Sequence, residues 1–256
     1  MTKRVKQVLF YSAVAFFLIS NYVIILYAQG YKYSFLENRF FRTGAIYLKT
    51  NTTADVYVDD KLLGNTSFFN NSYRLEGLLP GRYIIRIQQD DYSIWQKSVT
   101  VDEGFVSEFS KILLLSQSDG GLEELDKEIS LIFPSPVPAP SSLTASASQP
   151  FVLKKGALST YADEPEKIAE NVKGFALSKD KNKLAWWTAN EIWVMWLKDA
   201  GYQPYHKKGD KELITRFSTQ IKKAAWFRDE DHLIVDSGGY KILETDIRGG
   251  INIFKI

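Results

Sequence analysis

Residues that could act as catalysts or metal ligands are few in this chain of 256 residues. It contains no cysteine and two histidines, His206 and His232. The lack of cysteine excludes disulfides, thiolate metal ligands and a cysteine nucleophile. A zinc site needs three or four ligands at suitable spacing, which two distant histidines do not provide. We therefore expect no metal ion and no cofactor.

Two other polar segments could be functional, but simpler interpretations fit them better. The acidic run at residues 229–231 does not match a calcium-binding loop, so we expect a solvated turn there. Ser237 lies in DSGGY rather than in the G-x-S-x-G turn of a serine hydrolase. The sequence also has no phosphate-binding loop and no dinucleotide fingerprint. It therefore predicts no catalytic residue and a protein that is not an enzyme.

Residues 181–197, KNKLAWWTANEIWVMWL, contain four of the six tryptophans and allow three interpretations. As a second membrane span the segment is too short, and an Asn-Glu pair interrupts its apolar part. As an aromatic cage for a ligand it would need Trp187, Trp193 or Trp196 at the surface. Large aromatic side chains are more often buried, so we expect the cluster to form a protein core.

A different segment has the properties of a membrane anchor. Residues 8–28, VLFYSAVAFFLISNYVIILYA, form a run of 21 residues without a charge, and about 20 residues cross a bilayer as a helix. Three basic residues in the short N-terminal tail favour a cytoplasmic N-terminus. A cleaved signal peptide would have a shorter apolar core and a small residue where Leu26 stands. Residues 1–30 are therefore predicted to be a cytoplasmic tail and an uncleaved anchor in the cell membrane, with the bulk of the chain extracytoplasmic.

Residues 44–115 alternate short β-type runs with turn residues. In RYIIRIQ, the side chains of Tyr83, Ile85 and Ile87 share one face, as expected for a strand with one packed face and one solvated face. Pro80-Gly81 and Asp59-Asp60 provide turns between the runs. Seven short strands in about 70 residues predict a small β-sandwich.

The order of motifs in this segment resembles the PEGA domain. The motifs are ADVYVDDKLLGNTSF, LEGLLPGRYIIRI and DDYSIWQKSVTVDEG. The resemblance implies a small β-sandwich of the bacterial or archaeal cell envelope, and it implies no catalytic residue. Residues 51–54 (NTTA) replace the namesake tetrapeptide, Ser67 replaces a proline, and Asp91 replaces a glycine. Tyr92 and Trp95 could stack on a carbohydrate, but we expect both to be core residues.

Residues 116–150 contain five of the eight prolines and are predicted to be a Pro/Ser-rich linker. Within the linker, residues 122–133 could form an amphipathic helix ended by Pro134. Alternatively, its LIF triplet could be a strand that enters the next domain. The sequence does not choose between these two structures.

Residues 151–256 contain an internal repeat. ALSKDKNKLAWW, from Ala176, corresponds to AWFRDEDHLIVD, from Ala225, at an offset of 49 residues. Repeats of about 40 to 50 residues built of short strands are typical of propeller blades. The first copy, with its following EIWV, resembles the WD-like repeats of bacterial β-propellers, although Lys181 replaces their turn glycine. We expect a partial β-propeller-like domain, with at least two antiparallel sheets packed through Trp186, Trp193 and Trp226.

The remaining 106 residues are too few for the four to eight blades of a closed ring. We therefore expect an incomplete propeller from a truncated chain, with the outer faces of its sheets apolar and exposed. The predicted fold class is mainly β, with an N-terminal transmembrane helix, a small PEGA-like β-sandwich and partial β-propeller-like blades.

The net charge is +2, and no predicted folded segment has a large excess of basic residues. This argues against nucleic acid as a partner. The membrane, through residues 8–28, and a protein or cell-wall polymer are the expected partners. The preferred function is a non-catalytic, membrane-anchored extracytoplasmic protein that displays β-rich modules for cell-wall, surface-layer or protein partners. The alternative is the N-terminal portion of an exported peptidase or hydrolase with its catalytic domain beyond residue 256.

Overall fold

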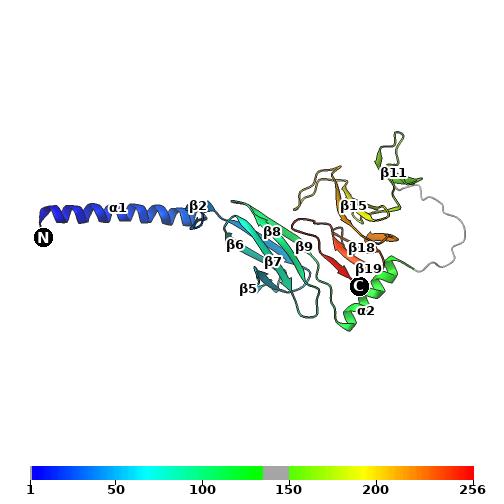
Figure 1. The fold of residues 1–256 in the computed structure, drawn as a ribbon, viewed down its shortest axis with the longest axis horizontal. Helices are drawn as coiled ribbons and strands as arrows, with labels where there is room; N and C mark the ends of the chain where they lie inside the picture. Colours follow the sequence, from blue (N-terminus) through cyan, green and yellow to red (C-terminus); the bar gives the residue numbers. More distant parts are fainter. Residues whose placement is uncertain (1, 135–149) are drawn as a thin grey trace.

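The computed structural model describes residues 2–134 and 150–256 and is mainly β, with an N-terminal apolar helix. In Figure 1 the helix α1 projects from one end of a β-rich body. A first β unit, residues 44–115, lies next to it, and three further sheets lie beyond. None of the sheets closes on itself within the described residues.

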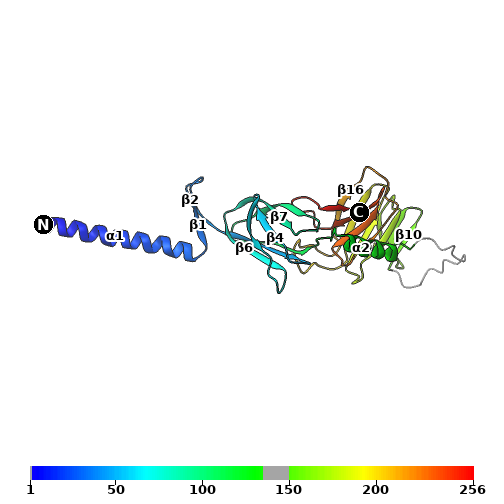
Figure 2. The same ribbon diagram turned by 90° about the horizontal axis from the view of Figure 1, so that it is seen from below.

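Helix α1, Lys3–Ala28, has the length and composition of a membrane-spanning segment, and none of its residues is buried in the protein. A hairpin of β1, Tyr31–Ser34, and β2, Arg39–Arg42, follows it directly. Figure 2 shows this hairpin standing across the direction of the helix.

The first β unit consists of two sheets with the strand orders β6-β3-β9 and β5-β4-β7-β8. Strands β3 and β9 are parallel, and all other neighbours are antiparallel. The strands are β3, Gly44–Thr50; β4, Asp55–Val58; β5, Lys61–Asn65; β6, Ser72–Leu78; β7, Gly81–Gln88; β8, Trp95–Val101; and β9, Val106–Ile112.

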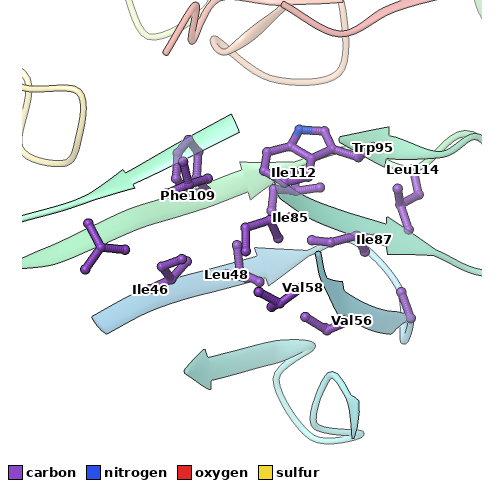
Figure 3. Close-up of a cluster of buried hydrophobic side chains, with 13 residues drawn as sticks. Ile46, Leu48, Val56, Val58, Ile85, Ile87, Trp95, Phe109, Ile112 and Leu114 are labelled. Carbon is purple, nitrogen blue, oxygen red and sulfur yellow. The ribbon is translucent and has the colours of Figure 1, made fainter. Parts of the chain in front are cut away.

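The two sheets of the first unit share one apolar core, drawn in Figure 3. The alternation predicted for β7 is confirmed, because Ile85 and Ile87 are fully buried while Ile84 is exposed. The turn between β4 and β5 is also where the sequence placed it. Asp59 and Asp60 both have positive φ there, which suits a two-residue hairpin turn.

Helix α2, Asp119–Ile132, resolves the alternatives left open for residues 122–133 in favour of a helix. The hydroxyl of Ser118 caps its N-terminus by accepting a hydrogen bond from the amide of Gly121. Leu125 and Ile129 lie one turn apart on its buried face.

Residues 150–256 form three antiparallel sheets in which each strand pairs with the next along the chain. We name them the first, middle and last sheets. The first comprises β10, Phe151–Lys154; β11, Ala157–Thr160; and β12, Lys167–Ala169. The middle sheet comprises β13, Gly174–Leu177; β14, Lys183–Trp187; β15, Glu191–Trp196; and β16, Lys211–Arg216. The last comprises β17, Lys223–Trp226; β18, His232–Asp236; β19, Tyr240–Glu244; and β20, Ile253–Lys255.

The repeated motifs occupy equivalent strands of the middle and last sheets. Ala176 and Ala225 lie in the first strands, and Leu184 and Leu233 lie in the second. The expected pair of antiparallel sheets is therefore confirmed, but the predicted packing is wrong in detail. Trp186 and the half-buried Trp193 pack toward the first sheet rather than the last. The middle and last sheets instead meet through an apolar cluster that includes Trp187, Trp196 and Trp226.

The expectation that the outer faces of the stack are exposed is wrong for the last sheet. Helix α2 covers this face, with Leu125 and Ile129 against Phe227, Ile234 and Ile242. An ion pair between Arg228 and Glu128, at 3.0 Å, joins the helix and the sheet at the edge of this contact. Residues 119–132 of the predicted linker are thus a helix packed on the last sheet, whereas its residues 135–149 lie outside the described residues.

Candidate functional site

Trp95 is a core residue, as predicted, with 1% of its surface exposed. Its ring packs edge-on against Phe109 in the core of the first β unit. In Figure 3 the indole nitrogen points out of this core. There Nε1 donates a hydrogen bond of 3.0 Å to the carboxylate of Glu244, in the last sheet. Trp95 therefore takes part in a contact between two parts of the chain that are distant in sequence.

We call this contact the junction. It joins β8 and β9 of the first unit to residues 198–210 and 244–252 of the sheet stack. The backbones meet directly, since the amide of Ser98 donates to the carbonyl of Gly249 at 3.0 Å. Gly249 has φ +66°, and a Cβ at this position would overlap the carbonyl oxygen of Ser98. Only glycine combines this backbone conformation with so close an approach.

Lys97 lies at the centre of the junction with its side chain fully buried. Its Nζ forms an ion pair of 2.8 Å with Glu244 and donates to the backbone carbonyl of Asp246. The second oxygen of Glu244 accepts the hydrogen bond from Trp95, and Asn252 donates to the first. Both buried charges are thus paired and hydrogen-bonded, which is the condition for tolerating them in the interior.

Arg248 extends the junction along β9. Its guanidinium lies 4.3 Å from the centre of the Phe109 ring and donates to the backbone carbonyl of Glu108 at 2.6 Å. The carboxylate of Asp246 holds the guanidinium by two charge-assisted hydrogen bonds. Gln203 bonds both to Arg248 and to the β9 backbone, at 2.9 to 3.0 Å. These contacts set the position of β9 relative to the sheet stack.

A second polar cluster lies beside the first, around Asp231. Its carboxylate accepts hydrogen bonds from Lys183, at 2.6 Å, and from the hydroxyl of Tyr202, at 2.7 Å. Burial, followed by the adjacent Asp231 charge, raises the pKa of Tyr202 far above its usual range. Lys111 of β9 approaches the same carboxylate at 3.8 Å. The solvated turn expected at residues 229–231 is wrong for Asp231, because its carboxylate is a buried anchor for two neighbouring groups.

The two histidines lie apart and have different surroundings. His232 is almost fully buried and bonds to Asp229 at 2.9 Å. Burial would raise the pKa of Asp229, but the hydrogen bonds from His232 and from two backbone amides outweigh it and lower that pKa.

His206 stacks on Trp196, with the ring centres 3.5 Å apart, and Nε2 lies 3.8 Å from Glu212. Burial lowers the pKa of His206 and raises that of Glu212. In the described residues no three His, Asp or Glu side chains converge as a metal site.

A small pocket of about 30 Å³ lies at the junction and is lined by residues of both β units. That volume holds roughly one or two water molecules. The charged groups around it are paired, Lys183 with Asp231 and Lys97 with Glu244.

Of the aromatic residues considered as ligand contacts, Trp187 and Trp196 are buried core residues. Trp193 is half-buried, stacked on Trp186 at 5.9 Å, and bonded through its indole nitrogen to Glu191. Sequence reasoning missed Lys97, Glu244 and Arg248. A signal for Lys97 was present, because it occupies the inward face of β8 between Trp95 and Val99.

No protein-family model matches the chain, and no curated protein matches it.

Proposed function

We propose that the protein is a non-catalytic, membrane-anchored extracytoplasmic scaffold. It displays two β modules at a fixed mutual orientation, for recognition of a cell-wall polymer, a surface-layer subunit or another protein. The observation that carries this proposal is the junction, in which the fully buried Lys97 of one module pairs with Glu244 of the other. A rigid two-module surface on an apolar helix suits presentation to a partner better than it suits turnover of a small substrate.

Two backbone conformations support the family resemblances. Asp91 stands where the PEGA motif has a glycine, and Lys181 stands where the WD-like repeat has one. Both residues have φ of +59°, the left-handed region that favours glycine. Both positions therefore have a backbone conformation that suits the glycine of the motif. These two turns support the proposal that residues 44–115 are a PEGA-like sandwich and that the three stacked sheets are propeller-like blades.

Membrane topology in intact cells tests the anchored part of this proposal. The full chain should remain in the membrane after carbonate washing, because α1 is 26 residues long and apolar. Protease added outside the cells should remove everything beyond about residue 30. A soluble product that begins near Gln29 would instead establish a cleaved signal sequence. Protection of both β units from external protease would place them on the cytoplasmic side.

Cosedimentation with cell walls tests whether the two β modules bind a partner. Detergent-solubilised full chain should cosediment with purified cell walls, whereas a Gly249→Ala variant with a loosened junction should bind more weakly. Cosedimentation of both proteins to the same extent would show that the fixed orientation has no role in binding. Failure of the native chain to bind cell walls would contradict recognition of a cell-wall polymer.

A further inference from the structure

The hairpin β1–β2 is held firmly between the anchor helix and the first β unit. Thr43 donates to the carbonyl of Gly30 through its amide and its hydroxyl, both at 2.8 Å, which closes the base of the hairpin. Phe40 contacts the ring of Tyr27 in α1 edge-on. On the other side, Lys32 donates to the carbonyl of Gly77 at 2.7 Å. The direction of the hairpin is therefore fixed relative to α1.

The tip of this hairpin is apolar and unusually exposed. Phe35 and Leu36 have 87% and 92% of their surface accessible, respectively. Nearby, the hairpin carries Lys32, Arg39 and Arg42 against a single acid, Glu37, which forms an exposed ion pair of 3.3 Å with Arg39. An exposed apolar tip with a cationic surround is the pattern of a segment that rests in a membrane interface.

The geometry of the anchor places this tip at the bilayer surface. The uncharged 21 residues of α1 span roughly 31 Å at 1.5 Å per residue, close to the hydrocarbon thickness of a bilayer. Ala28 then lies at the boundary of the hydrocarbon, and the hairpin begins three residues later, at headgroup depth. Because the hairpin stands across the helix (Figure 2), it extends along the membrane plane rather than away from it.

We infer that the β1–β2 hairpin is a second membrane contact. Phe35 and Leu36 insert into the headgroup layer beside the anchor, and Arg39 binds anionic lipid phosphates. This inference rests on the proposed membrane anchoring by α1. The contact would restrict tilting of the β units on the single helix.

Site-specific fluorescence on the full chain tests this inference, because the absence of native cysteine allows single labels. Leu36→Cys, Phe68→Cys and Phe17→Cys each receive an NBD probe. The proteins are reconstituted into phosphatidylcholine vesicles with or without phosphatidylglycerol. Nitroxide quenchers are attached either to the lipid headgroup or to the middle of the acyl chain. Phe68 is the matched control, because it is 84% exposed, lies next to another exposed phenylalanine, and precedes the end of β6 that is remote from Gly77.

The probe at residue 36 should emit at shorter wavelength and be quenched by the headgroup nitroxide, more strongly with phosphatidylglycerol. The probe at residue 68 should show neither effect. Adding Arg39→Gln to Leu36→Cys should weaken the dependence on phosphatidylglycerol.

The probe at residue 17 reports the anchor separately. Quenching at 17 by the acyl-chain nitroxide, without quenching at 36, would overturn the hairpin inference and leave the anchor intact. Loss of quenching at 17 would overturn membrane anchoring itself.

Discussion

Lys97 is the residue on which the two β units depend most directly. Replacing it with methionine would leave Glu244 buried without its cationic partner. Removal of one member of a buried pair costs about 3 to 5 kcal/mol of stability, and we expect a loss of that size for Lys97→Met in a urea titration.

The matched control is Lys167→Met, which removes an exposed ion pair with Glu170 and should leave the urea midpoint almost unchanged, because solvent screens such a pair. The double variant Lys97→Met with Glu244→Gln should recover part of the loss, because no unpaired charge remains. Equal, small effects of Lys97→Met and Lys167→Met would contradict the role of Lys97.

The lowered pKa of His206 predicts how the stability of the protein changes with pH. Burial against Trp196 lowers the pKa of His206 in the folded protein, so the unfolded chain binds the proton more readily. Stability should therefore decline as the pH falls from about 6.5 toward the lowered pKa. Burial of the Glu212 carboxyl raises its pKa, so this group lowers stability as the pH rises above about 4.5. Comparison with His206→Gln isolates the histidine.

The native protein should lose stability relative to His206→Gln as the pH falls below about 6.5. Parallel pH profiles of the two proteins would show that the histidine is not held neutral by its surroundings.

Among the elements, α2 gives the clearest test of how the stack is completed. Ile129 is buried against the last sheet, whereas Leu131, two residues further along, is 81% exposed. Ile129→Ala should destabilise the protein by about 2 to 4 kcal/mol through loss of apolar burial. Leu131→Ala should change stability by less than about 0.5 kcal/mol. Chemical denaturation monitored by tryptophan fluorescence measures both, and a stable Ile129→Ala protein would mean that α2 is not part of the core.

The strands were the part of the fold most accessible from sequence. Two-residue alternation gave the inward face of β7, and the offset of 49 residues gave two equivalent sheets, because both signals are local. The helix at residues 119–132 remained ambiguous, since its apolar face is short and its partner surface lies about 100 residues away. Trp186 packs toward the first sheet because that sheet covers its face of the middle sheet. Sequence periodicity shows which residues share a face but not which sheet covers that face.

The junction was not predictable as a site because its partners are remote in sequence. Trp95 and Lys97 meet Glu244 across about 150 residues. The inward position of Lys97 on β8 indicates an unusual environment, but it does not identify the carboxylate that neutralises the charge. The burial of Asp231 was equally hidden, because DEDHL in isolation has the composition of a solvated turn.

At the scale of the whole molecule, the junction holds the two β units in one mutual orientation. Spin labels at Phe68→Cys, in the first unit, and Lys222→Cys, before β17, report this orientation through their distance distribution. Both sites are exposed, and the chain has no other cysteine. In the detergent-solubilised full chain we expect a single narrow distance peak. The peak should broaden in Gly249→Ala, where a Cβ would collide with Ser98, and should be unchanged in Lys167→Met. A broad or multi-peaked distribution in the native chain would contradict the account.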